Sequence, residues 1–285
     1  MKKLLLLYLV LLISALVGCG GGESTPAPVE NLTAEEIIEA VLTAADDIET
    51  CHYDMDMSID ILVTNGESVE MLIPISMTGI SNEVIKEMWV ETKMTLDLPE
   101  EEGGKFDIDA ETYIFDGIVY MKMVIPQMGE IWAKQDMPQG YWDQTDQLTG
   151  EIELLRSVQV ELLGYEQVGG ADSYVLEVWP DLSRLWENMM QQTSVEDLLG
   201  EEFSAFNLRE MMQDISMKLW VAKGTFFPVR SEIEMNLVIN SETIDADYNM
   251  MMNIKNNNNY YNYNQSINIK LPAEAENAVE MSFLE

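Results

Sequence analysis

The feature that most constrains this chain is the regular alternation of apolar and polar residues. Tyr53-Asp54-Met55-Asp56-Met57 is typical, and the pattern recurs in about eleven segments between residues 53 and 269. Because successive side chains of a strand point to opposite faces, this period predicts strands with one buried and one solvated face. We expect hairpin turns at Asn65-Gly66, Asp116-Gly117 and Gly169-Gly170, and a further, asparagine-rich turn over 255–259. The last strand of the sheet is expected over 261–269.

Helical spacing is restricted to a few segments. Thr33 and Glu36 are spaced as a capping box ahead of Ile37 and Val41, which predicts an amphipathic helix of about four turns ending near residues 47–50. In the middle of the chain the spacing predicts a short helix around 148–155, a second helix that opens after Pro180, and a further helical turn from Ser194.

These segments predict an α+β chain that is mainly β. Antiparallel strands with one apolar face form a sheet that needs a cover on that face, and a sheet of about eleven strands curls or splits. The simplest assembly is a strongly curved antiparallel sheet, a half-barrel, with the few helices covering its concave face.

The N-terminus has the pattern of a secretory signal peptide. Lys2 and Lys3 precede an apolar run, Leu4 to Val17, which is followed by Gly18-Cys19. We expect residues 1–18 to be a signal peptide that is removed ahead of Cys19. The alternatives are an ordinary signal peptide, without lipid attachment, and a membrane-spanning helix. The run is shorter than the ~20 residues of a typical membrane span.

The next segment, residues 19–32, begins with a Gly-, Ser-, Thr- and Pro-rich stretch and has the composition of a flexible tether. Residues 33–285 are long enough for one folded domain. Stable membrane anchoring takes about two acyl chains, so a single acyl group on the tether would not be enough.

Several segments resemble those of known envelope lipoproteins. The ending Leu16-Val17-Gly18-Cys19 resembles the lipobox of prokaryotic lipoproteins, in which the cysteine carries the lipid anchor. The segments Leu32 to Ile38, Tyr53 to Met57, Tyr113 to Gly117, Leu219 to Lys223, Phe227 to Val229 and Leu271 to Ala275 resemble the superfamily of the lipoprotein carrier LolA, including the LppX- and LprG-like lipoproteins. This resemblance implies a single half-barrel over 33–285 with a helical lid and an apolar cavity for acyl chains. LolA itself carries no anchor, whereas Cys19 fits the anchored branch.

The composition argues against several classes of partner. The chain has 15 Lys and Arg against 51 Asp and Glu, a net charge of -36. Nucleic-acid binding needs clustered basic residues, so we expect no nucleic-acid partner. With Cys19 assigned to the anchor, Cys51 is expected to be a buried thiol with no intramolecular disulfide.

Catalytic signatures are weak throughout the chain. The one histidine, His52, lies among Asp54 and Asp56, so a catalytic triad or a histidine-rich metal site is difficult to build. Asp107 and Asp109 alternate within a strand pattern, which favours a solvated face over a calcium loop. We therefore expect no enzymatic activity, no catalytic residues, no metal site and no cofactor.

The 21 methionines leave three interpretations open. Methionine fills irregular cores, it suits a deformable cavity for flexible acyl chains, and its thioether can bind Cu(I). Methionines two apart on a strand, such as Met55 and Met57, point to the same face.

The leading hypothesis is an extracytoplasmic, lipid-anchored protein that binds a lipid or acyl chain for carriage or sensing. The alternatives are an acidic interaction or sensor module with a filled core and an unidentified envelope protein partner, and a Cu(I)-binding envelope protein. The residues predicted to line the cavity are Met55, Met57, Ile59, Met88, Val90, Ile108, Ile114, Met235, Leu237, Met250 and Met252, the predicted lid residues are Leu185, Trp186 and Met189, and the predicted lipid attachment site is Cys19.

Overall fold

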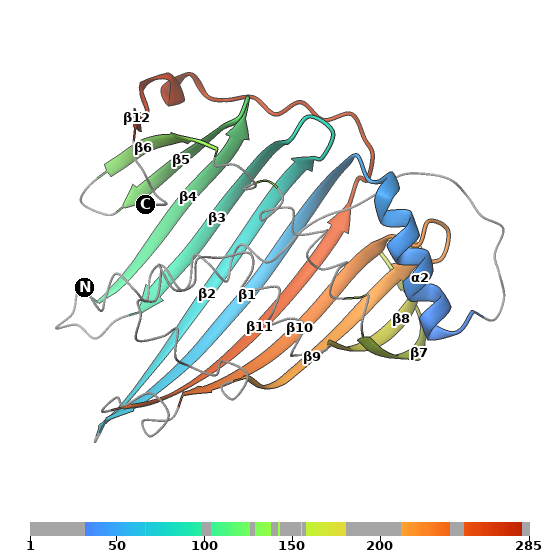
Figure 1. Cartoon of the computed structure of the whole chain (residues 1–285). Helices are drawn as coiled ribbons and strands as arrows, with labels where there is room; N and C mark the ends of the chain where they lie inside the picture. The colour runs from blue at the N-terminus through green and yellow to red at the C-terminus, as the bar shows by residue number, and fades with distance from the viewer. Residues whose placement is uncertain are drawn as a thin grey trace.

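The computed structural model describes residues 32–65, 67–97, 104–125, 129–137, 142, 155, 158–180, 212–239 and 248–280. Twelve strands form a single sheet (Figure 1). The strands are β1 Thr50–Asn65, β2 Glu67–Asn82, β3 Glu87–Asp97, β4 Lys105–Phe115, β5 Ile118–Ile125, β6 Gly129–Asp136, β7 Val158–Val168, β8 Ala171–Pro180, β9 Met212–Ala222, β10 Pro228–Ile239, β11 Asn249–Tyr261 and β12 Val279–Glu280, and the described helices are α2 Ala34–Ala44 and the 3₁₀ turns η1 Ala45–Asp47 and η3 Ala273–Asn277.

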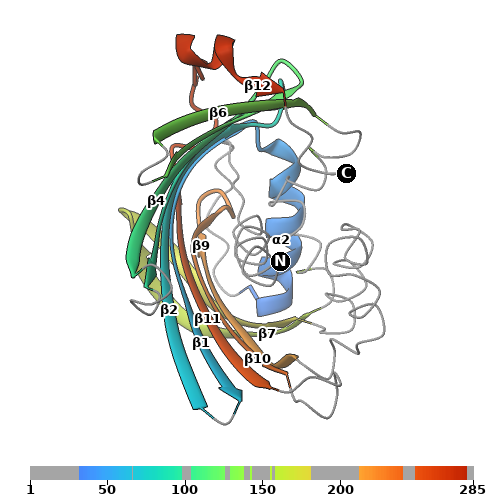
Figure 2. The same ribbon diagram turned by 90° about the vertical axis from the view of Figure 1, so that its left-hand side faces the viewer.

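The sheet is open, and its strand order is β12-β6-β5-β4-β3-β2-β1-β11-β10-β9-β8-β7. Neighbouring strands are antiparallel except β12, which pairs with β6 in parallel over two residues. Figure 2 shows that the sheet curves strongly and that α2 lies on its concave side. The predicted fold class, a curved antiparallel half-barrel with a helix on its concave face, is therefore confirmed.

Helix α2 begins at the predicted capping box. The side chain of Thr33 accepts a hydrogen bond from the Glu36 backbone N–H at 3.2 Å, and Glu36 Oε2 accepts from the Thr33 N–H at 2.8 Å. Such a cap stabilises a helix by about 1 kcal/mol. Ile37, Ile38 and Val41 are buried, so the apolar stripe of the helix faces the sheet.

The predicted hairpins are present. Asp116 and Gly117 have φ values of 52° and 74°, and Gly169 and Gly170 have 58° and 89°. Positive φ at both central residues gives a turn whose twist matches that of the flanking strands. The β1–β2 hairpin pairs Asn65 with Glu67, so it turns where the sequence predicted.

The asparagine-rich segment is not a turn, and this prediction is wrong. Residues 255–259 lie inside β11, where they pair with β1 on one side and β10 on the other. The predicted last strand over 261–269 is also wrong, because β11 ends at Tyr261 and residues 262–270 form no strand. The ladder bonds on both sides of β11 outweigh the low strand propensity of asparagine.

Candidate functional site

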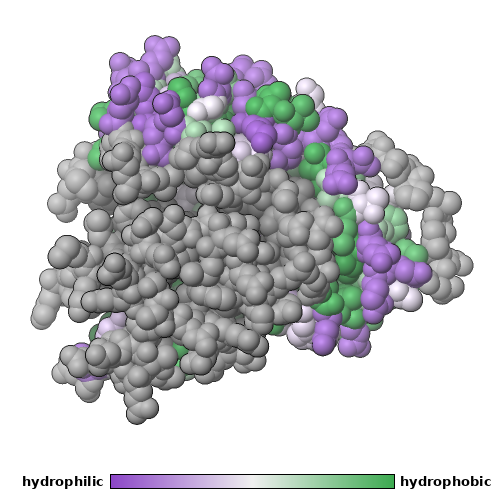
Figure 3. Space-filling view, in the orientation of Figure 1, coloured by the Kyte–Doolittle hydropathy of each residue, from purple (hydrophilic) through white to green (hydrophobic). Residues whose placement is uncertain are grey.

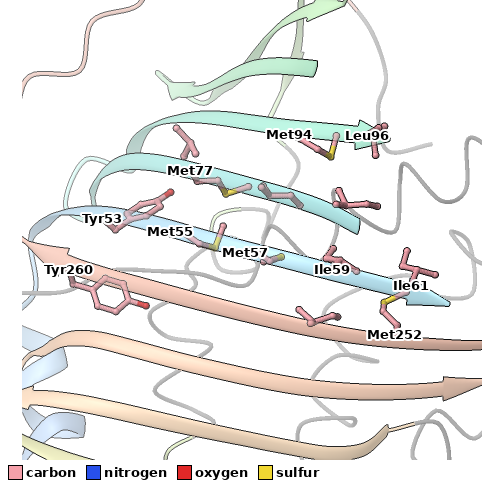
Figure 4. Packing of buried hydrophobic residues seen from close by; sticks show 14 of the residues in the cluster. Tyr53, Met55, Met57, Ile59, Ile61, Met77, Met94, Leu96, Met252 and Tyr260 are labelled. Atoms are coloured by element: carbon pink, nitrogen blue, oxygen red, sulfur yellow. The ribbon is translucent and has the colours of Figure 1, made fainter. Parts of the chain in front are cut away.

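The candidate site is the concave face of the sheet, onto which every second side chain of the central strands projects. Met55 and Met57 lie in the middle of β1, where they pair with Met77 and Ile75 of β2. On its other side β1 pairs with β11, and there Ile59 lies opposite Ile254. Figure 4 shows Met55, Met57 and Met77 on the same side of the ribbon.

All eleven side chains predicted to line a cavity lie on this concave face. Ten of them belong to one apolar cluster that spans β1, β2, β3, β4, β10 and β11. Ile114 belongs to a neighbouring cluster, in which it packs against Met88 and Trp142. Met55, Met57, Ile59, Val90, Ile114, Met250 and Met252 are buried, whereas Met88, Ile108, Met235 and Leu237 are partly buried. Their contact with a ligand stays a prediction.

Methionine is concentrated in this cluster. Met77 and Met94, which the sequence did not single out for the site, are buried beside Met55 and Met57, and Met71 packs at the edge. Methionine is unbranched and has three rotatable side-chain bonds, so a surface rich in it adapts to partners of varied shape.

Helix α2 covers a different part of the concave face. Its Ile37 and Val41 pack in a second cluster with Leu176 of β8 and with Leu219 and Val221 of β9. Leu155 belongs to the same cluster and is buried. The helix therefore lies over the β7–β9 end of the sheet (Figure 1).

A polar pair that the sequence analysis missed separates the two clusters. Asn256 and Asn258 alternate inward from β11, and Asn258 is fully buried. Asn258 pairs with Met55 on one side and with Ser231 on the other. The alternation of Met250, Met252 and Ile254 continues through both asparagines, and this periodicity was the signal that would have placed them.

The convex face is polar and acidic. An open hollow of about 560 Å³ there is lined mainly by outward residues of the central strands, among them Asp56, Lys93, Asp107 and Asp109. Asp107 accepts a hydrogen bond from Thr95 Oγ1 at 2.7 Å. Both Asp107 and Asp109 are exposed, which confirms the prediction of a solvated acidic face. Figure 3 looks onto the opposite, concave side, where both hydrophilic and hydrophobic residues of the described part of the chain reach the surface.

A sequence model of a protein family matches residues 33–280, which is most of the chain. That family is described as a family of unknown function, DUF6612. The chain belongs to DUF6612. No curated protein matches the sequence.

Solved structures with similarity to this DUF6612 protein include lipoprotein LppX from Mycobacterium tuberculosis, with 12% identity, 83% of this chain and 98% of that chain covered, and a TM-score of 0.38. A DUF1329 family protein from Desulfovibrio piger matches with 12% identity, 84% and 96% coverage and a TM-score of 0.28. A LolA superfamily protein from Nitrosomonas europaea matches with 14% identity, 86% and 97% coverage and a TM-score of 0.22.

The predicted lid residues Leu185, Trp186 and Met189, the anchor residue Cys19 and the predicted central helices apart from Leu155 lie outside the described residues. Across the described ranges, no helix combines the length and the hydropathy needed to span a membrane. In the same part of the DUF6612 chain, no group of three His, Cys, Asp or Glu side chains could hold a metal ion.

Cys51 differs from the expectation. It is fully buried at the start of β1, and its sulfur is disulfide-bonded. The expectation of a thiol with no disulfide assumed that Cys19, the other cysteine in the sequence, carries a lipid. The predicted burial of Cys51 is confirmed, whereas the prediction that it forms no disulfide is wrong.

Proposed function

We propose that this protein is an extracytoplasmic lipoprotein, anchored to the membrane through Cys19, that binds a lipid or acyl chain against the concave face of its sheet. The observation that carries the proposal is the apolar cluster around Met55 and Met57, which has members on six strands. The proposed role is binding for carriage or sensing, without catalysis.

The energetics of acyl-chain binding suit such a face. Burying each CH₂ group of a chain contributes about 0.8 kcal/mol, so a chain of ~16 carbons offers on the order of 10 kcal/mol before ordering is subtracted. Flexible methionine side chains allow the face to adjust to the chain. The resemblance of the sequence to LolA-like envelope lipoproteins supports the same ligand class.

Native mass spectrometry tests the proposal directly. The mature chain from residue 20 onward would be exported behind a cleavable signal peptide and purified without detergent, and bound small molecules would be identified in the same run. We expect a co-purified lipid, or uptake of a lipid offered as a ~16-carbon fatty acid. An apo mass that persists with every offered lipid contradicts the proposal.

Two neighbouring residues of β10 provide a matched pair of variants. Leu237 is partly buried and faces inward opposite Met252, whereas Val238 faces outward opposite the exposed Met251. We expect Leu237→Glu to weaken lipid binding at least tenfold, because the carboxylate must lose its water when the chain binds. Val238→Glu should leave binding within about twofold of the wild type. Equal effects of the two variants contradict the assignment of the site to the concave face.

A further inference from the structure

The buried asparagines of β11 are unusual because both lie on an apolar face. Asn258 is 0% exposed and Asn256 is 6% exposed. In the register, Asn256 lies between Met57 and Ile233, and Asn258 lies between Met55 and Ser231. Asn256 therefore lies between a residue of the large apolar cluster, Met57, and a residue of the cluster beneath α2, Ile233.

The hydrogen bonding of this pair is incomplete. Asn258 Nδ2 donates to Ser231 Oγ at 2.9 Å, but Oδ1 of Asn258 and Oδ1 of Asn256 are buried and accept no hydrogen bond. An unpaired buried polar group is destabilising, because it has given up its hydrogen bonds to water without replacing them. On the outward side of the same strand, by contrast, Asn253 Nδ2 donates to Asn236 Oδ1 at 2.8 Å.

The chemistry of the missing partner follows from the amides. The Ser231 hydroxyl can both donate and accept, so it could pair with either end of the Asn258 amide. If the oxygen and nitrogen of that amide were exchanged, the group left unpaired would be the NH₂ instead of the oxygen. A ligand hydroxyl also does both, so it completes the site in either orientation. The register partners of the two asparagines are uncharged. A charged head group would be desolvated there without a counter-charge.

The apolar residues next to the asparagines indicate a path for the acyl chain. From Asn256 to Met250 the inward positions of β11 are occupied by Ile254, Met252 and Met250. This stretch of the strand spans roughly 20 Å. A head group at the asparagines therefore has a continuous apolar strip beside it.

We propose that Asn256 and Asn258 form a head-group subsite for neutral, hydroxyl-bearing lipids of the acylglycerol or glycolipid class, with the acyl chain along the inward side of β11. This assignment rests on the proposed lipid-binding function and deepens it. The subsite selects among lipids, and the apolar strip supplies most of the affinity.

A competition between two lipids with the same acyl chain tests the subsite. The exported mature chain is offered an equimolar mixture of 1-monopalmitoylglycerol and methyl palmitate, and the ratio of the two complexes is measured by native mass spectrometry. We expect the monoacylglycerol complex to exceed the methyl ester complex by about tenfold, because two hydrogen bonds distinguish the two ligands.

The variant Asn256→Leu/Asn258→Leu removes both amides at similar side-chain volume. Its ratio of complexes should fall about tenfold relative to the wild type, and comparing ratios between proteins cancels the different solubilities of the lipids. The matched control is Asn257→Leu/Asn259→Leu, at the exposed positions that alternate with the pair. The control should keep the wild-type ratio.

The outcomes separate the two proposals. If neither lipid binds to the wild type, the lipid-binding function itself is wrong. If both lipids bind equally well to the wild type, lipid binding stands and the subsite is wrong, and this result needs no variant. If the wild type prefers the monoacylglycerol but the inward double variant keeps that preference, the amides hold only water and the subsite is again wrong.

Discussion

At the scale of single residues, Gly79 and Tyr53 illustrate how closely the central strands are fitted. They are opposite each other on β2 and β1, and the Tyr53 ring is buried in the space above the glycine. A Cβ atom at position 79 would lie 2.2 Å from Tyr53 Cζ. An aromatic ring that covers a strand glycine compensates for the missing side chain. Burial of this ring raises the pKa of the Tyr53 hydroxyl.

The prediction at this scale concerns Gly79→Ala. We expect it to lower the free energy of unfolding by about 1–3 kcal/mol, because the Tyr53 ring must leave its place in the cluster. Urea denaturation measures the loss. Gly224→Ala is the control, since an added Cβ there meets no atom within 4 Å. If both variants unfold at the same urea concentration, the contact does not constrain the fold.

At the scale of elements, a polar network ties the outward faces of β4, β5 and β6 together. Glu111 accepts hydrogen bonds from Lys122 Nζ at 2.8 Å and from the Tyr113 hydroxyl at 2.6 Å, and Lys122 also lies 3.6 Å from Glu130. Burial alone would raise the pKa of Glu111, but the hydrogen bonds from Lys122 and Tyr113 outweigh it and lower that pKa. On β3, Glu91 lies opposite Glu111 in the ladder.

The sign of this shift gives a pH dependence. Because the pKa of Glu111 is lower in the folded state, its stabilisation is present above the ordinary glutamate pKa of about 4.3 and is lost as the pH falls through the folded value. Glu111→Gln should destabilise the protein by about 1 kcal/mol at pH 7 and by less at pH 3. Thermal unfolding across this range, with Glu70→Gln on an exposed position of β2 as the control, measures the difference. A loss that does not change with pH contradicts the network.

The elements also show what the sequence could predict. Thr33 and Glu36 fixed the start of α2, and Asp116-Gly117 fixed a hairpin, because each signal acts through bonds or dihedral angles within a few residues. The prediction of a turn over 255–259 was wrong because the structure there depends on contacts that are distant in sequence. Its asparagines are held as a strand by ladders to β1 and β10, which are distant in sequence. Only the alternation of Met250, Met252 and Ile254, followed on through the asparagines, would have shown that two of the amides face inward.

At the scale of the whole molecule, the anchor and the disulfide compete for one sulfur atom. The sequence contains two cysteines, and a sulfur in a thioether to a lipid cannot also form a disulfide with Cys51. We expect the protein extracted from membranes to carry a diacylglyceryl group on Cys19. Its intact mass should then exceed that of the chain from residue 19.

The measurement has a defined contrary outcome and a control. A mass two hydrogens below that of the reduced chain, which returns to the reduced value on treatment with a reductant, would show an intrachain disulfide and contradict the anchor. Cys19→Ser should release the protein from the membrane fraction, whereas Cys51→Ser should leave it there. Release by both substitutions equally would also contradict the proposed attachment.

The strand order has a consequence for the biogenesis of the protein. The chain builds outward from β1 to β6, resumes at the opposite edge with β7, and returns inward to β11, which pairs with β1 in the middle of the sheet. That central ladder joins residues about 200 positions apart, from His52–Tyr261 to Thr64–Asn249. During vectorial synthesis or export, no strand can therefore join the two halves of the sheet until about the last eighth of the chain emerges. We therefore expect the two halves of the sheet to stay unpaired for most of the passage through a translocation pore, so that the chain can still move through it. The sheet becomes a single cooperative unit only at the end.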